Sequence, residues 1–386
     1  DQHGTADAKA LLHGSTSKRS NDREIRLTKV FILITLVASL FATIDVVGIL
    51  LRHVHNGSSG AVLEQSIFIF IVAFLVYGNL VYQFTRLGYL KRKARHSAAD
   101  INALRPVFKS DKRGLTILVP SYKEEPGVIE QTLWSAALQV CPQRRVVLLI
   151  DNPVNTTDLK DLHLLDITRR LPHRVEKILA EQAGRFRLAY DSYRQQQMVD
   201  FRKETQHVAM LYKEASRWFA DQAKQFRINS HTDRLFIDKV FLEPAVMYRQ
   251  HARSLSIRGN KRKGVILNRE QIEHEYNRLL ALFEVKLDYF ERKKYVNLSH
   301  EANKAMNLNS YLGLMGGSYI ERVKGKEVFL EEAGSKLAEL VVPDTEFVVT
   351  LDADSIIAHD YSARLIHQLD QPGNQRVAVI QTPYSA

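Results

Sequence analysis

The sequence predicts an α/β protein in which a mostly parallel sheet carries a large helical insertion and follows a two-helix transmembrane hairpin. Two long apolar segments lie near the N-terminus, at about residues 30–51 and 61–84. Short β-rich runs that end in carboxylates occur both early and late in the remaining chain. Charged sequence with apolar residues at helical spacing, residues 155–295, separates these runs.

Composition limits the class of protein. With 386 residues, 45% hydrophobic and 25% charged, the chain is globular and large enough for about two or three domains. Its net charge of +11 is compatible with binding to nucleic acid, to an anionic membrane surface or to a phosphorylated substrate, and it does not distinguish among these partners. The single cysteine, Cys141, excludes an intrachain disulfide and a cysteine-built zinc site. Because the sequence starts at Asp1 and stops at Ala386 within a segment that reads as folded, we expect a fragment of a longer protein.

The two apolar segments are long enough to cross a bilayer. About 20 apolar residues, at a rise of about 1.5 Å each, span a hydrocarbon core of about 30 Å. Within residues 30–51 the only ionisable side chain is Asp45, which marks either a functional pathway or a polar contact with a neighbouring helix. One such segment would also fit a signal peptide or a buried core helix. Two in succession, joined by the polar loop 52–60, favour a helical hairpin within residues 27–90.

The basic residues predict the orientation of this hairpin. The connecting loop carries only Arg52, whereas both outer flanks carry several cations: Lys18, Arg19, Arg23, Arg26 and Lys29 before it, and Arg86, Lys91, Arg92, Lys93 and Arg95 after it. The positive-inside rule then places a disordered basic tail (1–26), a basic linker (91–112) and both termini in the cytosol of a plasma or inner membrane. These clusters would face anionic membrane lipids, which explains much of the charge without nucleic acid. No nucleic-acid-binding motif occurs.

The first β-rich block predicts a strand–helix–strand unit. TILVP (116–120) reads as a buried parallel strand, the helix after it has apolar residues at helical spacing, and RVVLLID (145–151) reads as a second strand ending on Asp151. Ligands of open α/β sheets bind at the carboxyl edge, where Asp151 would lie. Neither a GxGxxG fingerprint nor a P-loop is present.

The second block places two carboxylates after a strand. FVVTLDADS (347–355) ends in Asp352 and Asp354, whose spacing suits a shared divalent cation with phosphate oxygens completing its shell. The alternative is a turn in which Asp354 caps the next helix. Lys304, in HEANKAMNLN (300–309), could neutralise a diphosphate or simply begin a solvated helix. RVAVIQTPYS (376–385) predicts one further strand.

Together these segments resemble the family 2 glycosyltransferases, particularly the membrane-embedded synthases of the cellulose-synthase type. The matching segments are VPSYKEEPGV, LLIDNP, NKAMNLN, LDADS and VIQTPYS, which occur in the family's order behind hydrophobic helices. The resemblance covers residues 27–154 and 296–386, somewhat over half of the chain.

The resemblance implies a GT-A, Rossmann-like domain built from residues 113–154 and 296–386. It implies a nucleotide-sugar donor, a UDP-sugar first of all, with Asp151 at the base, Lys304 near the diphosphate and Mg²⁺ or Mn²⁺ on Asp352 and Asp354. The implied donor-binding residues are Pro120, Tyr122, Glu124, Asp151, Lys304 and Asp352. The implied acceptor is a growing polysaccharide or a lipid-linked sugar.

Several family features are missing. Asn152 replaces a second acidic residue and Met306 replaces a glycine. The later acidic motif that supplies the catalytic base and the QxxRW acceptor motif are absent, so the base is expected downstream of residue 386 and the catalytic residue is unknown. We therefore expect this chain alone to bind a nucleotide sugar weakly at best and to be inactive.

The charged segment 155–295 is expected to form a helical insertion, with Val175, Ile178 and Leu179 on one helical face. Its histidines show no metal-ligand spacing, so solvated helical faces are the default and a surface for a protein partner is the alternative. Three functions remain open. They are a polysaccharide-forming transferase, a non-processive transferase acting on a lipid carrier, and a catalytically inactive membrane scaffold whose insertion binds a partner.

Overall fold

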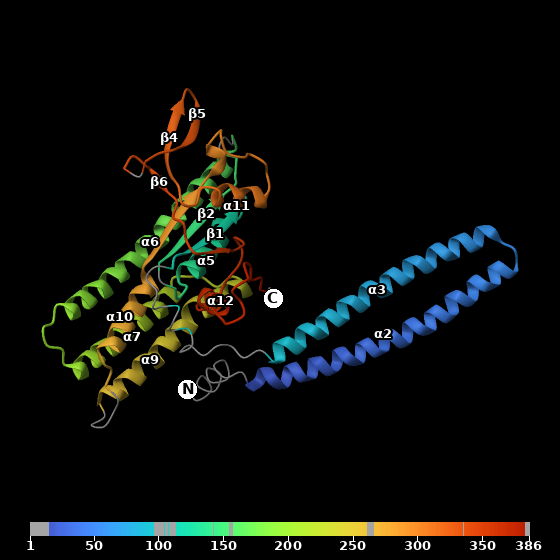
Figure 1. Cartoon of the computed structure of the whole chain (residues 1–386), viewed down its shortest axis with the longest axis horizontal. Helices are drawn as coiled ribbons and strands as arrows, with labels where there is room; N and C mark the ends of the chain where they lie inside the picture. The colour runs from blue at the N-terminus through green and yellow to red at the C-terminus, as the bar shows by residue number, and fades with distance from the viewer. Residues whose placement is uncertain are drawn as a thin grey trace. The chain divides into compact units, whose positions relative to one another are not determined.

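The computed structural model describes residues 15–95, 104, 107, 113–141, 143–153, 157–260, 266–334 and 336–382. The chain divides into two compact units, Asp1–Ala98 and Ala99–Ala386, which are described separately (Figure 1). Residues 1–14 of the expected tail and most of the expected linker 91–112 lie outside the described residues.

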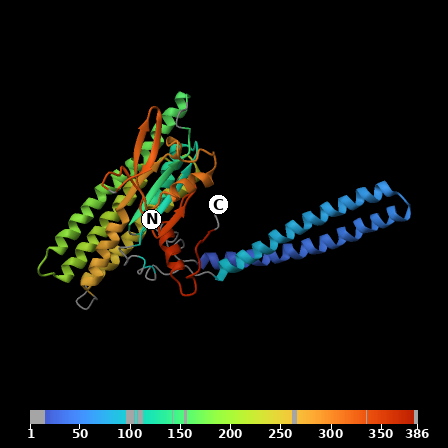
Figure 2. The ribbon, with the colours of Figure 1, turned by 45° about the horizontal axis from the view of Figure 1, so that its top comes forward.

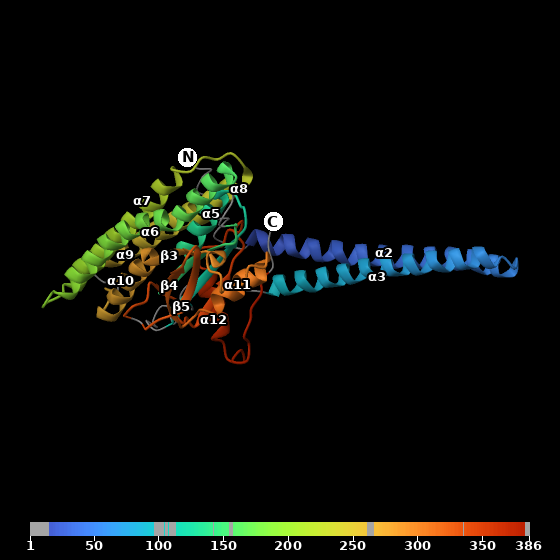
Figure 3. The ribbon, with the colours of Figure 1, turned by 90° about the horizontal axis from the view of Figure 1, so that it is seen from above.

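The first unit is a pair of long helices, α2 (Ser15–His55) and α3 (Ser59–Arg95), which run side by side (Figure 3). Both are long and apolar enough to cross a membrane. The expectation of a disordered tail over residues 1–26 is wrong from Ser15 onward. No glycine or proline interrupts this stretch before Gly48, so nothing in it opposes helix formation.

Two glutamines join the helices of this hairpin. The amide of Gln83 donates to Thr35 Oγ1 at 2.8 Å, and the amide of Gln65 donates to the carbonyl of Val46 at 3.2 Å. In an apolar surrounding, polar side chains favour partners on the neighbouring helix because lipid offers none. These contacts therefore join the two helices at two points along their length.

The second unit contains a four-stranded, all-parallel sheet in the order β3-β2-β1-β7. Its strands are β1 (Leu115–Ser121), β2 (Arg144–Ile150), β3 (Val285–Phe290) and β7 (Phe347–Thr350). The strands predicted around 116–120, 145–151 and 347–350 are confirmed. Strand β3 lies within residues 155–295 and corrects the expectation of a helical insertion there for residues 285–290.

The strand order reverses next to β1. From β1 the chain adds β2 and β3 on one side and then returns to place β7 on the other. In open parallel sheets the loops leaving two such strands diverge, which opens a crevice at their carboxyl ends. The loops after β1 and β7 therefore lie where such sheets bind ligands.

Helices cover one face of this sheet (Figure 2). They are α5 (Pro126–Ala137), α6 (Leu159–Arg194), α7 (Phe201–Ala223), α8 (His231–Phe236) with the π-helix η2 (Ile237–Leu242), α9 (Glu243–Asn260) and α10 (Arg269–Phe283). Side chains of the insertion, such as Val175 and Phe219, share a single buried core with Ile117 and Val146 of the sheet. The insertion is therefore a structural layer of this unit.

The opposite face carries α11 (Lys304–Leu312) and a small sheet of order β5-β4-β6. Its strands are β4 (Ser318–Lys324), β5 (Glu327–Glu332) and β6 (Leu340–Val341), and their core includes Tyr311, Tyr319 and Leu330 against Leu118 and Leu149. Helix α12 (Tyr361–Leu369) follows β7. The strand expected over 376–385 does not form in residues 376–382, and the rest of it lies outside the described residues.

Candidate functional site

Pro120 lies near the end of the central strand β1, at the point where β7 stops pairing with it. The carbonyl of Gly114 accepts from Phe347 and that of Leu118 from Leu351, so alternate residues of β1 face β7. Pro120 is also one of the alternate residues of β1 that face this side. No residue of β7 lies opposite it, however, because β7 ends at Thr350. A proline is tolerated here because no strand requires its missing N–H.

The loop after β1 is tied to the loop after β2. Lys123 has a left-handed backbone with φ of 55°, and its N–H donates to Asn152 Oδ1 at 2.9 Å. Its ammonium pairs with Asp161 at 2.8 Å, which raises the pKa of Lys123. Tyr122 and Glu124 beside it are exposed. Asn152 thus holds this loop through its amide oxygen.

Asp151 is nearly inaccessible, with 5% of its surface exposed. Its Oδ1 accepts from Arg292 Nε at 2.9 Å and lies 3.2 Å from Lys293 Nζ. The Lys293 ammonium also donates to the Asp151 carbonyl at 2.6 Å and lies 5.8 Å from the ring of Tyr122. The carboxylate expected to contact a nucleotide base is therefore already compensated by two cations of the protein.

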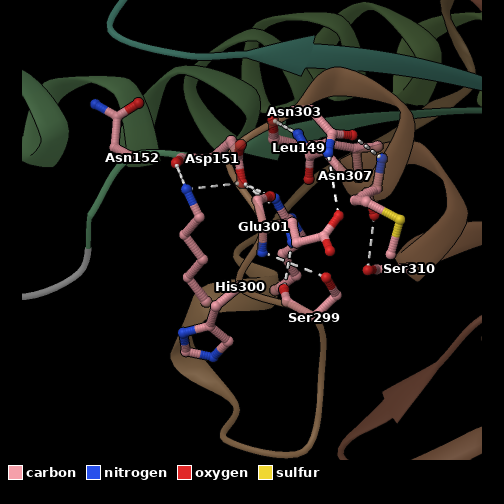
Figure 4. A network of polar contacts seen from close by, with 12 residues as sticks. Leu149, Asp151, Asn152, Ser299, His300, Glu301, Asn303, Asn307 and Ser310 are labelled. Atoms are coloured by element: carbon pink, nitrogen blue, oxygen red, sulfur yellow. Dashed lines mark hydrogen bonds and ion pairs between the residues drawn. The ribbon is translucent and has the colours of Figure 1, made fainter.

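Arg292 organises the loop that leads to α11. It is fully buried, and its guanidinium donates to the carbonyls of Ser299 and Glu301 as well as to Asp151. Figure 4 shows how Asp151, Ser299 and Glu301 surround this network. A buried cation is tolerated only when paired and fully hydrogen-bonded, and Arg292 meets both conditions.

Sequence reasoning missed Arg292 and Lys293. Both follow β3, which was assigned to the helical insertion. The available signal was the alternation of apolar and polar residues in VKLDYF (285–290), followed directly by the charged run ERKK (291–294).

Helix α11 is anchored to the same edge. Asn303 is its N-cap, and its side chain accepts from the N–H of Met306 at 2.7 Å. Asn307, only 1% exposed, donates to the carbonyl of Leu149 in β2 at 2.9 Å (Figure 4). The helix therefore starts at a defined position, with Lys304 as its first residue.

Lys304 and Asp352 are brought together. The Lys304 ammonium forms an ion pair with Asp352 Oδ1, and both side chains are partly exposed. Asp352 directly follows the last sheet contact of β7, in which the N–H of Leu351 donates to Leu118 at 2.9 Å. Two residues that sequence reasoning placed in one site are thus in contact.

Asp352 and Asp354 lie in a turn that is fixed by its buried middle residue. The carbonyl of Ala353 accepts from Thr132 Oγ1 at 2.7 Å, and the N–H of Ser355 donates to the Asp352 carbonyl at 3.0 Å. The alternative in which Asp354 caps the next helix is wrong, because α12 begins at Tyr361 and its N-cap is Asp360. Asp354 is exposed.

These two carboxylates are the side chains that could hold a divalent cation. Within the described residues, no group of three or more His, Cys, Asp or Glu side chains is placed to bind a metal. Mg²⁺ accepts one or two carboxylates when phosphate oxygens and water complete its shell. Two carboxylates alone would leave most of the coordination shell of such an ion to phosphate oxygens and water.

No known protein family, curated protein or solved structure significantly matches the chain. The observations define a mixed α/β protein with a four-stranded parallel sheet and two long apolar N-terminal helices.

Proposed function

We propose that the protein is a membrane-bound, metal-dependent glycosyltransferase of GT-A type that uses a nucleoside-diphosphate sugar. The observation that carries this proposal is the contact of Lys304 with Asp352 at the carboxyl edge of β7, beside the point where the strand order reverses. A cation and a carboxylate at this position are the groups that a diphosphate and its metal ion need.

Glycosyl transfer requires a stabilised diphosphate leaving group. When bound, Mg²⁺ or Mn²⁺ supplies positive charge to that group. Asp352 and Asp354 would hold the ion, and Lys304 would contribute a point charge to the phosphates. Because Lys304 pairs with Asp352, donor binding would exchange this ion pair for two ligand contacts.

A cytosolic membrane location is part of the proposal. The two apolar helices support a hairpin through the bilayer, and the basic residues on its open side support cytosolic termini. The donor site would then meet cytosolic UDP-sugars, and the acceptor would be a growing polysaccharide or, alternatively, a lipid-linked sugar.

A second candidate is a catalytically inactive membrane scaffold. The observation that favours it is the pairing of Asp151 with Arg292 and Lys293. Because its carboxylate already pairs with these two cations, Asp151 would not be available to contact a nucleotide base. In this proposal the exposed side of the helical insertion would bind a protein partner.

Calorimetric titration of the full chain in detergent with UDP, with and without Mn²⁺, separates the two candidates. For the transferase we expect binding that requires Mn²⁺ and is lost in the Asp352→Asn/Asp354→Asn variant. Asp288→Asn is the control, because it neutralises a carboxylate within strand β3, before the strand ends. Because weak binding is expected of this chain, the titration extends to millimolar ligand. Failure of the wild-type chain to bind UDP or GDP at such concentrations, with or without Mn²⁺, would overturn the donor site and favour the scaffold.

A further inference from the structure

A groove lies at the open end of the helical hairpin. Its volume is about 520 Å³, within the range of roughly 300–1,000 Å³ that is typical of small-ligand pockets. Glu24 of α2 lines it together with side chains of α3 that include Tyr82, Arg86, Tyr89, Arg92 and Lys93. We call it the Arg86 groove.

The groove is cationic, and the structure shows no ion pair between its cations and another described residue. Arg86, Arg92 and Lys93 contribute three positive charges against the single carboxylate of Glu24. None of these four side chains forms an ion pair with a residue that the structure describes. Most exposed arginines and lysines that touch nothing are simply solvated, but three that line one hollow create a concentrated positive field.

The aromatic side chains of this groove are of the kind that is typical of a membrane interface. Tyr82 and Tyr89 are exposed, and Tyr82 ends the uncharged apolar run of α3. Tyrosines concentrate where hydrocarbon meets headgroups. With Tyr82 at the edge of the hydrocarbon, Arg86 lies about 6 Å further along α3, inside a headgroup layer that is about 5–8 Å thick on each side. By the same rise Arg92 and Lys93 lie about 15 Å beyond Tyr82, on the aqueous side of this layer. Long side chains of a helix point back toward its N-terminus, which for α3 is the direction of this layer.

We propose that the Arg86 groove binds the headgroup of an anionic phospholipid that carries hydroxyl groups, such as phosphatidylglycerol. Arginine suits the phosphate because its planar guanidinium donates two parallel hydrogen bonds to phosphate oxygens. The Glu24 carboxylate would accept from a headgroup hydroxyl, and the two tyrosines would pack on the glycerol backbone. The inference rests on the proposed insertion of the hairpin into a membrane and is independent of the sugar-transfer proposal.

The test is native mass spectrometry of the full chain released from nanodiscs that contain phosphatidylcholine alone or with phosphatidylglycerol. The groove variant is Arg86→Gln/Arg92→Gln/Lys93→Gln. The matched control is Arg23→Gln/Arg26→Gln/Lys29→Gln, which removes the same charge from the same end of the hairpin outside the groove lining. All six residues are exposed, so both variants should keep the helical content of the wild type by circular dichroism.

We expect the wild type to retain phosphatidylglycerol in preference to phosphatidylcholine. The groove variant should lose this retention by about tenfold or more, because it removes the charge-assisted hydrogen bonds that the groove would donate to the lipid phosphate. The control variant should stay within about twofold of the wild type, because residual surface attraction is screened by salt.

Three results would overturn the inference. Equal losses in both variants would indicate diffuse surface attraction without a site. Displacement of the lipid by millimolar inorganic phosphate would indicate a site for free anions, and incorporation of the wild type without any lipid preference would leave the groove without a ligand. Failure of the wild type to enter nanodiscs at all would instead contradict the membrane hairpin itself.

Discussion

The ammonium of Lys304 pairs with the carboxylate of Asp352, which joins the first residue of α11 to the carboxyl end of β7. The two residues are far apart in the sequence, and two separate motifs predicted that both belong to the same site. The pair has a direct consequence for ligand binding, because a cation entering beside Asp352 must compete with Lys304. Lys304 would then be available to a diphosphate.

Replacing Lys304 with glutamine should separate phosphate recognition from base recognition. We expect Lys304→Gln to weaken Mn²⁺-dependent UDP binding by about tenfold, as for a lost charge-assisted contact. Uridine, which has no phosphate, should bind both proteins equally. Calorimetry with the two ligands makes the comparison, and Lys326→Gln, at an exposed lysine between β4 and β5, is the control. An unchanged UDP affinity would exclude Lys304 from phosphate contact.

Cys141 should be chemically silent in the folded protein. It is only 1% exposed, and burial raises the pKa of its thiol to about 11. The thiolate is the reactive form, so both access and ionisation oppose modification. We expect negligible reaction with a disulfide reagent at pH 8 and full reaction in urea. Rapid labelling of the native chain would contradict the burial of this residue. If the expectation holds, labelling of this single cysteine reports unfolding of the sheet unit.

Arg292 should be essential for stability. Removing one partner of a buried, hydrogen-bonded ion pair costs about 3–5 kcal/mol, and Arg292→Gln would leave Asp151 with only Lys293. A urea titration followed by Cys141 labelling should therefore shift to markedly lower urea. The control is Arg322→Gln, which removes an exposed pair with Glu331 at 3.9 Å and should cost less than about 1 kcal/mol. Equal shifts in the two variants would contradict the role given to Arg292.

His359 should make the sheet unit less stable in acid. Its ring packs against those of Phe219 and Tyr248, and its Nε2 lies 2.6 Å from the Tyr248 hydroxyl. Burial lowers the pKa of His359 to about 3, below the usual value of 6.5. Between these values the unfolded chain binds the extra proton, so the stabilisation is complete above pH 6.5 and decreases as the pH falls toward 3.

The expected size is up to about 1.4 kcal/mol of unfolding free energy per pH unit for this one proton. Thermal unfolding at pH 7, 6 and 5, read by circular dichroism, should show the decrease in the wild type. The His359→Gln variant should show a shallower pH dependence, whatever its stability at pH 7. Parallel profiles for the two proteins would exclude His359 as the source. Glu275 adds to the decrease only below its usual value of 4.5, because its folded pKa is about 2.

Strand β3 illustrates where reading the sequence failed. The alternation in VKLDYF is a regular strand pattern, yet it follows more than a hundred residues of helical sequence and was assigned to them. Its place beside β2 depends on pairing between segments that are distant in the sequence, and the pattern of neighbouring residues does not predict such pairing. The same error concealed Arg292 and Lys293, since the importance of this basic run depends on the strand that precedes it.

Local patterns in the sequence determined the two apolar helices, the strands β1, β2 and β7, and the positions of Asp151, Lys304 and Asp352 at strand or helix ends. These features follow from hydrophobic periodicity and from turn residues, which act over a few positions of the chain. Only the tertiary structure decided that the insertion covers one face of the sheet, that Asp151 is compensated by Arg292, and that Lys304 reaches Asp352. These relationships arise from packing and from the pairing of buried charges, which depend on which distant segments meet in the folded chain.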